Sequence, residues 1–319
     1  MRRFLLVLFL LMVLTSCRAV VYKVEQTRII LGTRITITVL DPDQIRAKEA
    51  INQAFETIKG LEVKFDINDN NSDVGVLSKN KRLLGANQDM LYIMRKSIFY
   101  SFVSDGAYDP TVQSINDIYN KADALNKTPT DTEIIEARKT VGFQRIRIEN
   151  DSIFMHNGTK IGLAGIAKGY VTDNAIQTLK SFGVTRAMIN TGGDISAIGT
   201  KAKKESWSVK LQNPNNGTQF IASIELSNQS MASYGDYERY YEPSKKVKYV
   251  INPKTGRMDS DLISAIVIAP NATDADALAQ SVFILGKEKG ISLIESFPET
   301  SAILVTKERQ IIRSSRFKD

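Results

Sequence analysis

Cys17 is the only cysteine in the chain of 319 residues, and this excludes whole classes of stabilising chemistry. A single thiol cannot form an intramolecular disulfide or a zinc site built from several cysteines. His156 is the only histidine, which excludes histidine-rich zinc sites as well. The fold must therefore rely on a hydrophobic core, and a chain of this length with 43% hydrophobic residues can bury one.

The segment before Cys17 has the pattern of an export signal. Arg2 and Arg3 precede an unbroken apolar run at 4–14, which is shorter than the roughly 20 residues of a membrane-spanning helix. A charged start followed by such a run is typical of a secretory signal peptide. Residues 14–17 (LTSC) resemble a bacterial lipobox, in which the cysteine is lipidated after cleavage. A plain signal peptide with an incidental cysteine is the alternative.

These features define the expected organisation and location. We expect a lipoprotein signal peptide at 1–17 with lipidation at Cys17, a short linker at 18–27, and one folded domain at 28–319. A lipid anchor would hold the protein on a membrane of the bacterial cell envelope, facing the periplasm. The net charge of +7 is scattered along the chain, so no nucleic-acid partner is expected. The charge is compatible with attraction to an anionic membrane or a phosphate-bearing ligand.

Hydrophobic periodicity predicts an α+β fold, because strands and helices mix without the strict alternation of a doubly wound parallel sheet. Alternation and short apolar runs predict strands at 28–40, 145–154 (two strands with a turn at 150–151), 187–190, 207–211, 220–226, 248–252, 262–269, 302–306 and 310–312. Helical spacing and stop signals predict helices at 44–60, 88–104, 131–141, 168–182, 273–285 and 289–296. The polar stretch 61–81 is expected to be a loop.

Two segments favour the binding of a phosphate ester and a hard metal ion. Residues 162–169 are rich in glycine and lead into a predicted helix, whose first N–H groups attract anions, and Lys168 adds a positive charge there. Asp276 and Gln280 lie on one face of another predicted helix, and their side-chain oxygens suit Mg²⁺. The alternatives are a tight turn with a surface lysine for the first segment and a helix cap formed by Thr273 with Asp276 for the second.

Other binding motifs are excluded. Residues 66–70 begin like a calcium loop, but Asn71 replaces its glycine and Leu77 its bidentate glutamate. The glycine-rich stretch 162–169 lacks the Gly-Lys-Ser/Thr of a P-loop. No Gly-x-Ser-x-Gly nucleophile elbow is present in the chain.

A series of motifs, in order and at matching spacing, resembles the ApbE family of FAD:protein FMN transferases over about residues 28–295. The motifs are Gly32-Thr33, residues 106–112 (GAYDPTV), 167–170 (AKGY), 190–194 (NTGGD), 235–238 (GDYE), 251–256 (INPKTG), 272–279 (ATDADALA) and 283–286 (FILG). The resemblance implies a single α+β domain of two tightly joined lobes, with mixed or antiparallel sheets, flanking helices and a flavin cleft between the lobes.

The resemblance also implies an activity. Members of this family bind FAD as substrate with Mg²⁺ as cofactor, transfer its FMN part to a Ser or Thr hydroxyl of a target flavoprotein, and release AMP. Catalysis of this kind is mainly positioning and charge neutralisation. The expected partner is a protein with a Ser/Thr acceptor motif, such as a membrane redox complex subunit or an exported flavoprotein.

Site residues follow from the same resemblance. Asp276, Gln280 and the backbone carbonyl of Gly165 would bind the metal, and Lys168 would face the pyrophosphate, so that Asp276 and Lys168 are the expected catalytic residues. The expected FAD contacts also include Leu31, Asn68, Ala107, Tyr108, Asp109, Gly162 and Ile251. Asp194 and Asp236 are candidates for the base that deprotonates the attacking hydroxyl.

Four positions depart from the family pattern. Gly162 replaces the usual Asp, Tyr249 the usual His, and Gln280 the usual Thr or Ser ligand. Asn68 aligns with a Tyr that covers the flavin site in typical members, and members with Asn there hydrolyse FAD to FMN and AMP. The alternatives are therefore a Mg²⁺-dependent FAD pyrophosphatase and a flavin-binding lipoprotein without turnover.

Overall fold

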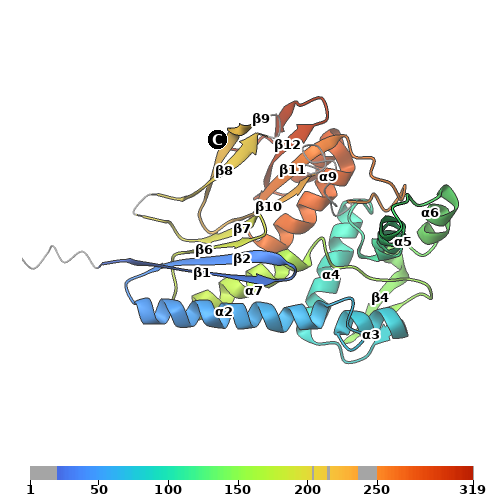
Figure 1. The fold of residues 1–319 in the computed structure, drawn as a ribbon, viewed down its shortest axis with the longest axis horizontal. Coiled ribbons are helices and arrows are strands. Elements are labelled where there is room, and N and C mark those ends of the chain that lie inside the picture. Colours follow the sequence, from blue (N-terminus) through green and yellow to red (C-terminus); the bar gives the residue numbers. More distant parts are fainter. Residues whose placement is uncertain (1–19, 203–204, 214–215, 236–249, 319) are drawn as a thin grey trace, which may run out of the picture.

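An antiparallel sheet of eight strands forms the centre of the structure, a computed structural model that describes residues 20–202, 205–213, 216–235 and 250–318 (Figure 1). The strand order is β1-β2-β6-β7-β10-β11-β12-β13, and every neighbouring pair is antiparallel. The bounds are Tyr22–Ile30 (β1), Thr33–Asp41 (β2), Ala187–Thr191 (β6), Asp194–Ile198 (β7), Ser230–Gly235 (β10), Leu262–Ala269 (β11), Ser301–Thr306 (β12) and Ile311–Arg313 (β13).

Three long helices pack on one face of this sheet. They are α2 (Gln44–Phe65), α7 (Ala167–Ser181) and α9 (Ala272–Glu295). Ile51 and Phe55 of α2 are fully buried in the main core, which also contains the alternating apolar side chains of β2. The apolar face of α2 and the apolar face of β2 thus pack against each other in one core.

The hairpin of β8 (Trp207–Asn213) and β9 (Asn216–Leu226) covers part of the opposite face. Trp207 is buried there, and its indole N–H donates to the carbonyl of Ile198 at 3.3 Å. Strand β11 is buried along its whole length because its side chains alternate between the two cores. A continuous apolar run is expected of such a doubly covered strand.

A second group of elements lies at one end of the sheet, at the right of Figure 1. It contains a small sheet in the order β3-β5-β4 and a cluster of buried side chains around Ile115, Ile134 and Ile251. Its elements are α3 (Asp73–Asn80), β3 (Arg82–Leu83), α4 (Gln88–Val103), the 3₁₀ turn η1 (Pro110–Val112), α5 (Gln113–Ala124), α6 (Asp131–Arg138), the 3₁₀ turn η2 (Phe143–Arg145), β4 (Ile146–Glu149) and β5 (Ser152–Met155).

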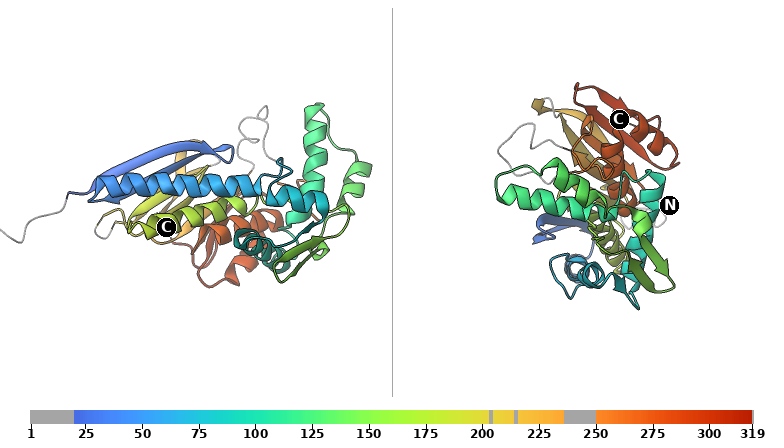
Figure 2. Two further views of the ribbon diagram at one scale, coloured as in Figure 1. Left: turned by 90° about the horizontal axis from the view of Figure 1, so that it is seen from below. Right: turned by 90° about the vertical axis from the view of Figure 1, so that its right-hand side faces the viewer.

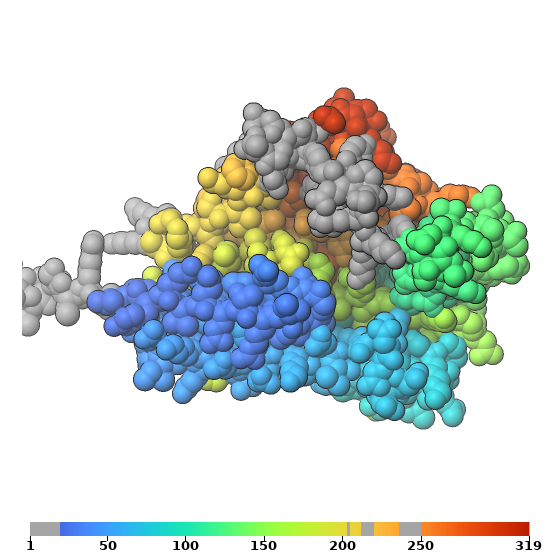
Figure 3. Space-filling model, viewed as in Figure 1, coloured from blue at the N-terminus to red at the C-terminus, as the bar shows by residue number. Residues whose placement is uncertain are grey.

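The two groups form one unit, since the main core continues from the sheet helices into α4 and β5. Figure 2 shows α2 and α7 running side by side, with the α4–α6 group at one end of the molecule. In the space-filling view, α2 and the β1–β2 hairpin form one surface and α5 with α6 another (Figure 3). The predicted α+β class is confirmed.

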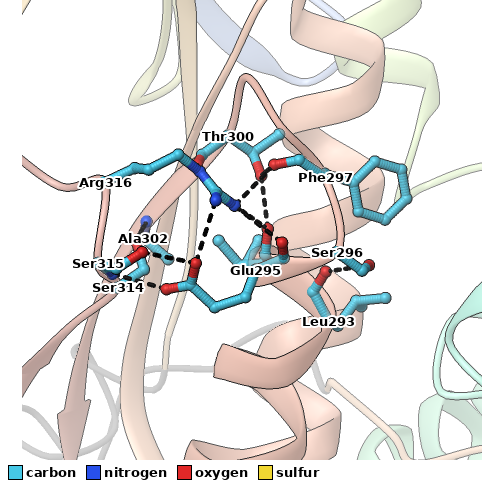
Figure 4. Close-up of polar contacts among 10 residues, drawn as sticks. Leu293, Glu295, Ser296, Phe297, Thr300, Ala302, Ser314, Ser315 and Arg316 are labelled. Atoms are coloured by element: carbon cyan, nitrogen blue, oxygen red, sulfur yellow. Dashed lines mark hydrogen bonds and ion pairs between the residues drawn. The ribbon is translucent and has the colours of Figure 1, made fainter.

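Helix α9 bends at Gly286, and its C-terminal end is held by hydrogen bonds from Arg316. Gly286 has φ 78°, and a Cβ there would lie 2.5 Å from the Asp261 carboxylate, so glycine is required. Arg316 donates to the carbonyls of Ile294, Glu295, Phe297 and Thr300 at 2.9–3.2 Å (Figure 4). The carbonyls of Ile294 and Glu295 are in the last turn, which has no further helical donors, and those of Phe297 and Thr300 belong to the loop that follows, so Arg316 joins the helix end to this loop.

The sequence predictions agree with most elements and fail at identifiable places. The two helices predicted at 273–285 and 289–296 form the kinked α9, and the strands predicted within 145–154, 207–226 and 302–312 are confirmed and pair as hairpins. The prediction of a linker at 18–27 is wrong from Tyr22 onward, because β1 begins there and pairs with β2 around a turn at Leu31-Gly32. The single strand predicted at 28–40 is this hairpin.

Two further predictions differ from the structure, and several elements were not predicted. The loop predicted at 61–81 contains the last turn of α2 and the helix α3, which Ser72 caps by accepting the N–H of Gly75. Helix α5 and strands β7 and β10 were not predicted. The strand predicted at 248–252 lies partly outside the described residues, and within them only Asn252 forms a bridge, to Arg257. Within the described ranges, no helix has the length and apolarity to cross a membrane.

Candidate active site

The first turn of α7 packs directly against the first turn of α9, so that their backbones are in contact. A Cβ on Gly169 would lie 2.2 Å from the carbonyl oxygen of Ala272, so only glycine allows this approach. The N–H of Gly169 donates to Oδ2 of Asp276 at 3.0 Å. The start of α7, with its unpaired donors and partial positive charge, therefore holds the carboxylate of α9.

Three charged groups gather at this junction. Lys168 Nζ is hydrogen-bonded to Oδ2 of Asp194, the first residue of β7, and Asp194 Oδ1 also accepts the N–H of Ser233 at 3.0 Å. Asp276 is fully buried nearby. Burial alone would lower the pKa of Lys168, but the carboxylates of Asp276 and Asp194 outweigh it and raise that pKa. Burial raises the pKa of Asp276 against the opposing effect of Lys168. Two carboxylates share one ammonium, an excess of negative charge that favours a cation.

Gln280 presents an oxygen that lacks a partner. Its Oε1 is one of three buried side-chain polar atoms among the described residues without a hydrogen bond. A Cβ on Gly165 would lie 1.5 Å from this oxygen and 2.9 Å from Cε2 of Tyr108. A buried acceptor left unpaired costs about 1–3 kcal/mol, so the arrangement points to a group that supplies the missing interaction.

The donors at this point fit Mg²⁺. Asp276 supplies a carboxylate, Gln280 an amide oxygen one helical turn later, and the loop at Gly165 passes against that amide. Across the described residues, no cluster of three or more His, Cys, Asp or Glu side chains forms an all-protein metal cage. This is the donor set expected for Mg²⁺, which typically binds one or two carboxylates and takes its other ligands from water and substrate phosphates.

The helix cap considered for Thr273 with Asp276 is not formed. Asn271 caps α9 by accepting the N–H of Asp274 at 2.9 Å, and the Thr273 hydroxyl donates to Asp173 on α7. Asp276 is thereby left free to face Gly169.

Residues 107–109 are buried beside the junction. Tyr108 touches the site with its ring edge, while its hydroxyl pairs with Ser97 Oγ at 3.0 Å. Asp109 caps η1 by accepting the N–H of Thr111 and also accepts the N–H of Phe143, both at 2.8 Å. Burial raises the pKa of Asp109 despite these hydrogen bonds. Ala107 and Asp109 are 3% and 4% exposed, so both side chains lie in the interior.

Leu31 and Asn68 lie near the C-terminal end of α2. Leu31 forms the β1–β2 turn with φ 57°, and its N–H donates to Glu62 of α2 at 2.5 Å. Asn68 follows α2 in an exposed loop, with its N–H bonded to Asp66. Leu31 therefore lies in the turn of the β1–β2 hairpin, and Asn68 in the loop that follows α2.

The structure places two of the predicted FAD contacts, Gly162 and Ile251, against other parts of the protein. Gly162 leaves room that Gln113 fills, because a Cβ at Gly162 would lie 2.4 Å from the Gln113 amide oxygen. Gln113 was not predicted as a site residue. Only the structure shows that its side chain lies in the space that a side chain at position 162 would otherwise fill. Ile251 is 2% exposed and packs with Ile115 and Ile134, so its side chain is committed to the core. Cys17, Asp236 and Tyr249 lie outside the described residues.

The profile of the ApbE family matches residues 31–304, which is most of the chain. The chain belongs to the ApbE family. Among its relatives, the FAD:protein FMN transferase of Treponema pallidum is 24% identical and aligns over 95% of this chain and 91% of its own length. The FAD:protein FMN transferase of Haemophilus influenzae is 26% identical, with 88% and 86% covered.

Solved structures agree with the family assignment. The ApbE protein of Thermotoga maritima superposes with a TM-score of 0.83 at 28% identity, covering 92% of this chain and 97% of its own. The flavin transferase ApbE of Vibrio cholerae has a TM-score of 0.79 at 21% identity, covering 93% and 99%, a likeness of fold. The ApbE-like architecture expected from the motifs is therefore confirmed.

Proposed function

We propose that this protein transfers FMN from FAD to a Ser or Thr hydroxyl of a target protein in a Mg²⁺-dependent reaction that releases AMP. The observation that carries the proposal is the unpaired oxygen of Gln280 beside Asp276 and Gly165, next to Lys168 at the start of α7. The candidate metal site lies where the first turn of α9 packs against the first turn of α7, which carries Lys168. A cation and a helix N-terminus beside a metal ion can together bind the negative charge of a pyrophosphate.

Each residue has a role that its position supports. Asp276, Gln280 and the carbonyl of Gly165 would hold Mg²⁺, which neutralises charge on the pyrophosphate. Lys168 would contact the phosphate oxygens while Asp194 orients its ammonium group. The acceptor hydroxyl releases its proton to solvent as its oxygen bonds to the FMN phosphorus, the bond from that phosphorus to the bridging oxygen breaks, and AMP leaves with that oxygen. Asp194 already accepts hydrogen bonds on both oxygens, so we assign it to positioning Lys168 rather than to deprotonating the acceptor.

The experiment combines two products in one assay. The protein beginning after Cys17 is incubated with FAD, Mg²⁺ and a peptide that carries a Ser/Thr acceptor motif, and both AMP and peptide mass are measured. We expect a peptide heavier by one FMN, loss of both products with EDTA, and their return with added Mg²⁺. Asp276→Ala should abolish both products. Tight FAD binding with no AMP from the wild-type protein would instead mean a flavin-binding protein without turnover.

A second candidate, hydrolysis of FAD to FMN and AMP, rests on Asn68. This small amide lies in an exposed loop where typical family members carry a covering tyrosine. Water could then compete with the acceptor hydroxyl. AMP without a modified peptide is the expected result for hydrolysis, and Asn68→Tyr should then lower AMP release measured without peptide.

The location proposed is the bacterial cell envelope, by lipidation of Cys17. The first strand begins at Tyr22, five residues after this cysteine, and five extended residues reach at most about 17 Å. The anchored enzyme would therefore act on targets close to the membrane, such as a subunit of a membrane redox complex. Labelled fatty acid should be incorporated into the wild-type protein and not into Cys17→Ala, and that variant should leave the membrane fraction.

A further inference from the structure

Tyr234 of β10 contacts two parts of the metal site at once. Its hydroxyl lies 3.1 Å from Oδ1 of Asp276 on α9 and 3.3 Å from the carbonyl oxygen of Ala164, the residue before Gly165. The loop and the helix that supply the expected ligands are therefore joined through one phenol group.

The Tyr234 hydroxyl cannot donate a full hydrogen bond to both acceptors. A phenol carries one hydrogen, and both the carboxylate and the carbonyl are acceptors. The hydrogen bond to the charged carboxylate is the stronger of the two, so Tyr234 holds Oδ1 of Asp276 while leaving the carbonyl of Ala164 in contact.

The carboxylate of Asp276 is thus fixed from two sides. The N–H of Gly169 holds Oδ2 at 3.0 Å, and Tyr234 holds Oδ1 at 3.1 Å. Lys168 Nζ lies 5.9 Å from the Tyr234 ring centroid, so the same side chain also borders the ammonium group. Each oxygen keeps further lone pairs for a cation, but the plane of the carboxylate is set.

We infer that Tyr234 is a positioning residue of the metal site, which orients the Asp276 carboxylate and keeps the Gly165 loop in register with α9. This inference rests on the proposed Mg²⁺ function of the site. Groups that orient a metal ligand through a hydrogen bond typically change metal affinity 10- to 100-fold when they are removed.

The test is Tyr234→Phe, which keeps the ring and removes only the hydroxyl. The rate of AMP release is measured against Mg²⁺ concentration, which gives kcat and the apparent dissociation constant for Mg²⁺ (the Mg²⁺ constant). The dissociation constant for Mn²⁺ without FAD is measured by electron paramagnetic resonance. We expect both metal constants to rise 10- to 100-fold, with kcat at saturating metal within a few-fold of wild type. Tyr170→Phe is the matched control, because that hydroxyl donates to Asp89 outside the site, and its metal constants should not change.

The outcomes separate this inference from the function on which it rests. Unchanged metal constants in Tyr234→Phe, alongside normal Mg²⁺-dependent turnover in wild type, would overturn the positioning role alone. A fall in kcat that saturating metal does not restore would overturn it as well. A wild-type protein that neither binds Mn²⁺ nor releases AMP would overturn both the inference and the proposed function.

Discussion

Asp173 on α7 accepts the backbone N–H of Thr273 at 2.8 Å and also the Thr273 hydroxyl, 100 positions further along the chain. The same carboxylate accepts the N–H of Ala272 at 2.8 Å. Helix α7 therefore caps the helix that carries Asp276 and Gln280, while Lys168 lies one turn earlier on α7. The two halves of the candidate site are fixed to each other by this cap.

Asp173→Ala should weaken both stability and the site. Three donors at the start of α9 would lose a partly buried charged acceptor, which we expect to cost about 2 kcal/mol of unfolding free energy. Mg²⁺-dependent AMP release should fall because the first turn of α9 is no longer held. Denaturant unfolding and the AMP assay measure these effects.

The matched control for that change is Asp43→Ala. Asp43 caps α2 by accepting the N–H groups of Ile45 and Arg46 at an exposed helix end. This variant should lose about 1 kcal/mol and retain AMP release. Equal losses of activity in both variants would show that helix stability in general, rather than the α7–α9 cap, governs the site.

Gly165→Ala should disable metal binding, with some loss of stability because the added methyl group also lies 2.9 Å from the buried ring of Tyr108. The added methyl group would overlap Gln280 Oε1, so the amide must rotate out of its present position. We expect the apparent Mg²⁺ constant to rise at least roughly 10-fold, as for other changes that displace a ligand. Gly60→Ala is the control, since a Cβ on this exposed glycine of α2 has nothing within 4 Å. It should stabilise the protein by about 0.5–1 kcal/mol and leave the metal constant unchanged.

Arg316→Ala should destabilise the protein without altering the metal site. The guanidinium group donates to four carbonyls at and just beyond the C-terminal end of α9 and forms an ion pair with Glu295 at 3.2 Å (Figure 4). We expect a loss of about 1–3 kcal/mol, measured by urea unfolding. Arg316→Lys should recover only part of it, because a single ammonium cannot reach the same set of acceptors. Full recovery by lysine would mean that charge alone, rather than the fork of donors, closes the helix.

Stability should fall at low pH partly through Asp89. Burial opposes the charged form of this carboxylate, but hydrogen bonds from Lys64 and Tyr170 prevail, and the pKa of Asp89 lies below its ordinary value. The unfolded chain therefore takes up the proton first. The stabilisation is complete above the unfolded pKa near 4 and is lost as the pH falls through the lower folded value.

Asp89→Asn should remove this part of the acid sensitivity. Because Asp89 and Lys64 are partly exposed, we expect the difference between pH 6 and pH 3 to shrink by no more than about 1 kcal/mol. The melting temperature measured over this range gives the slope. Glu49→Gln, at an exposed position of α2, should keep the wild-type slope. An identical slope in Asp89→Asn and wild type would contradict the assignment.

The sequence by itself determined the elements whose patterns are local. The helices at α2, α4 and α7 follow from apolar spacing and caps, and the buried strand β11 from its continuous apolar run. The motifs around Lys168 and Asp276 also marked the two halves of the candidate site. These features depend on neighbours within about two helical turns, so periodicity and residue type are sufficient to reveal them.

Only the tertiary structure decided how these pieces meet. Asp194 pairs with Lys168, Tyr234 with Asp276, and Gln113 fills the space beside Gly162. Each pair joins residues tens of positions apart on different elements, and a long-range contact leaves no periodic trace in either segment. The missed strand β1 has the same cause: its pairing with β2 depends on the turn at Leu31, a non-glycine residue in a left-handed conformation that local propensity disfavours.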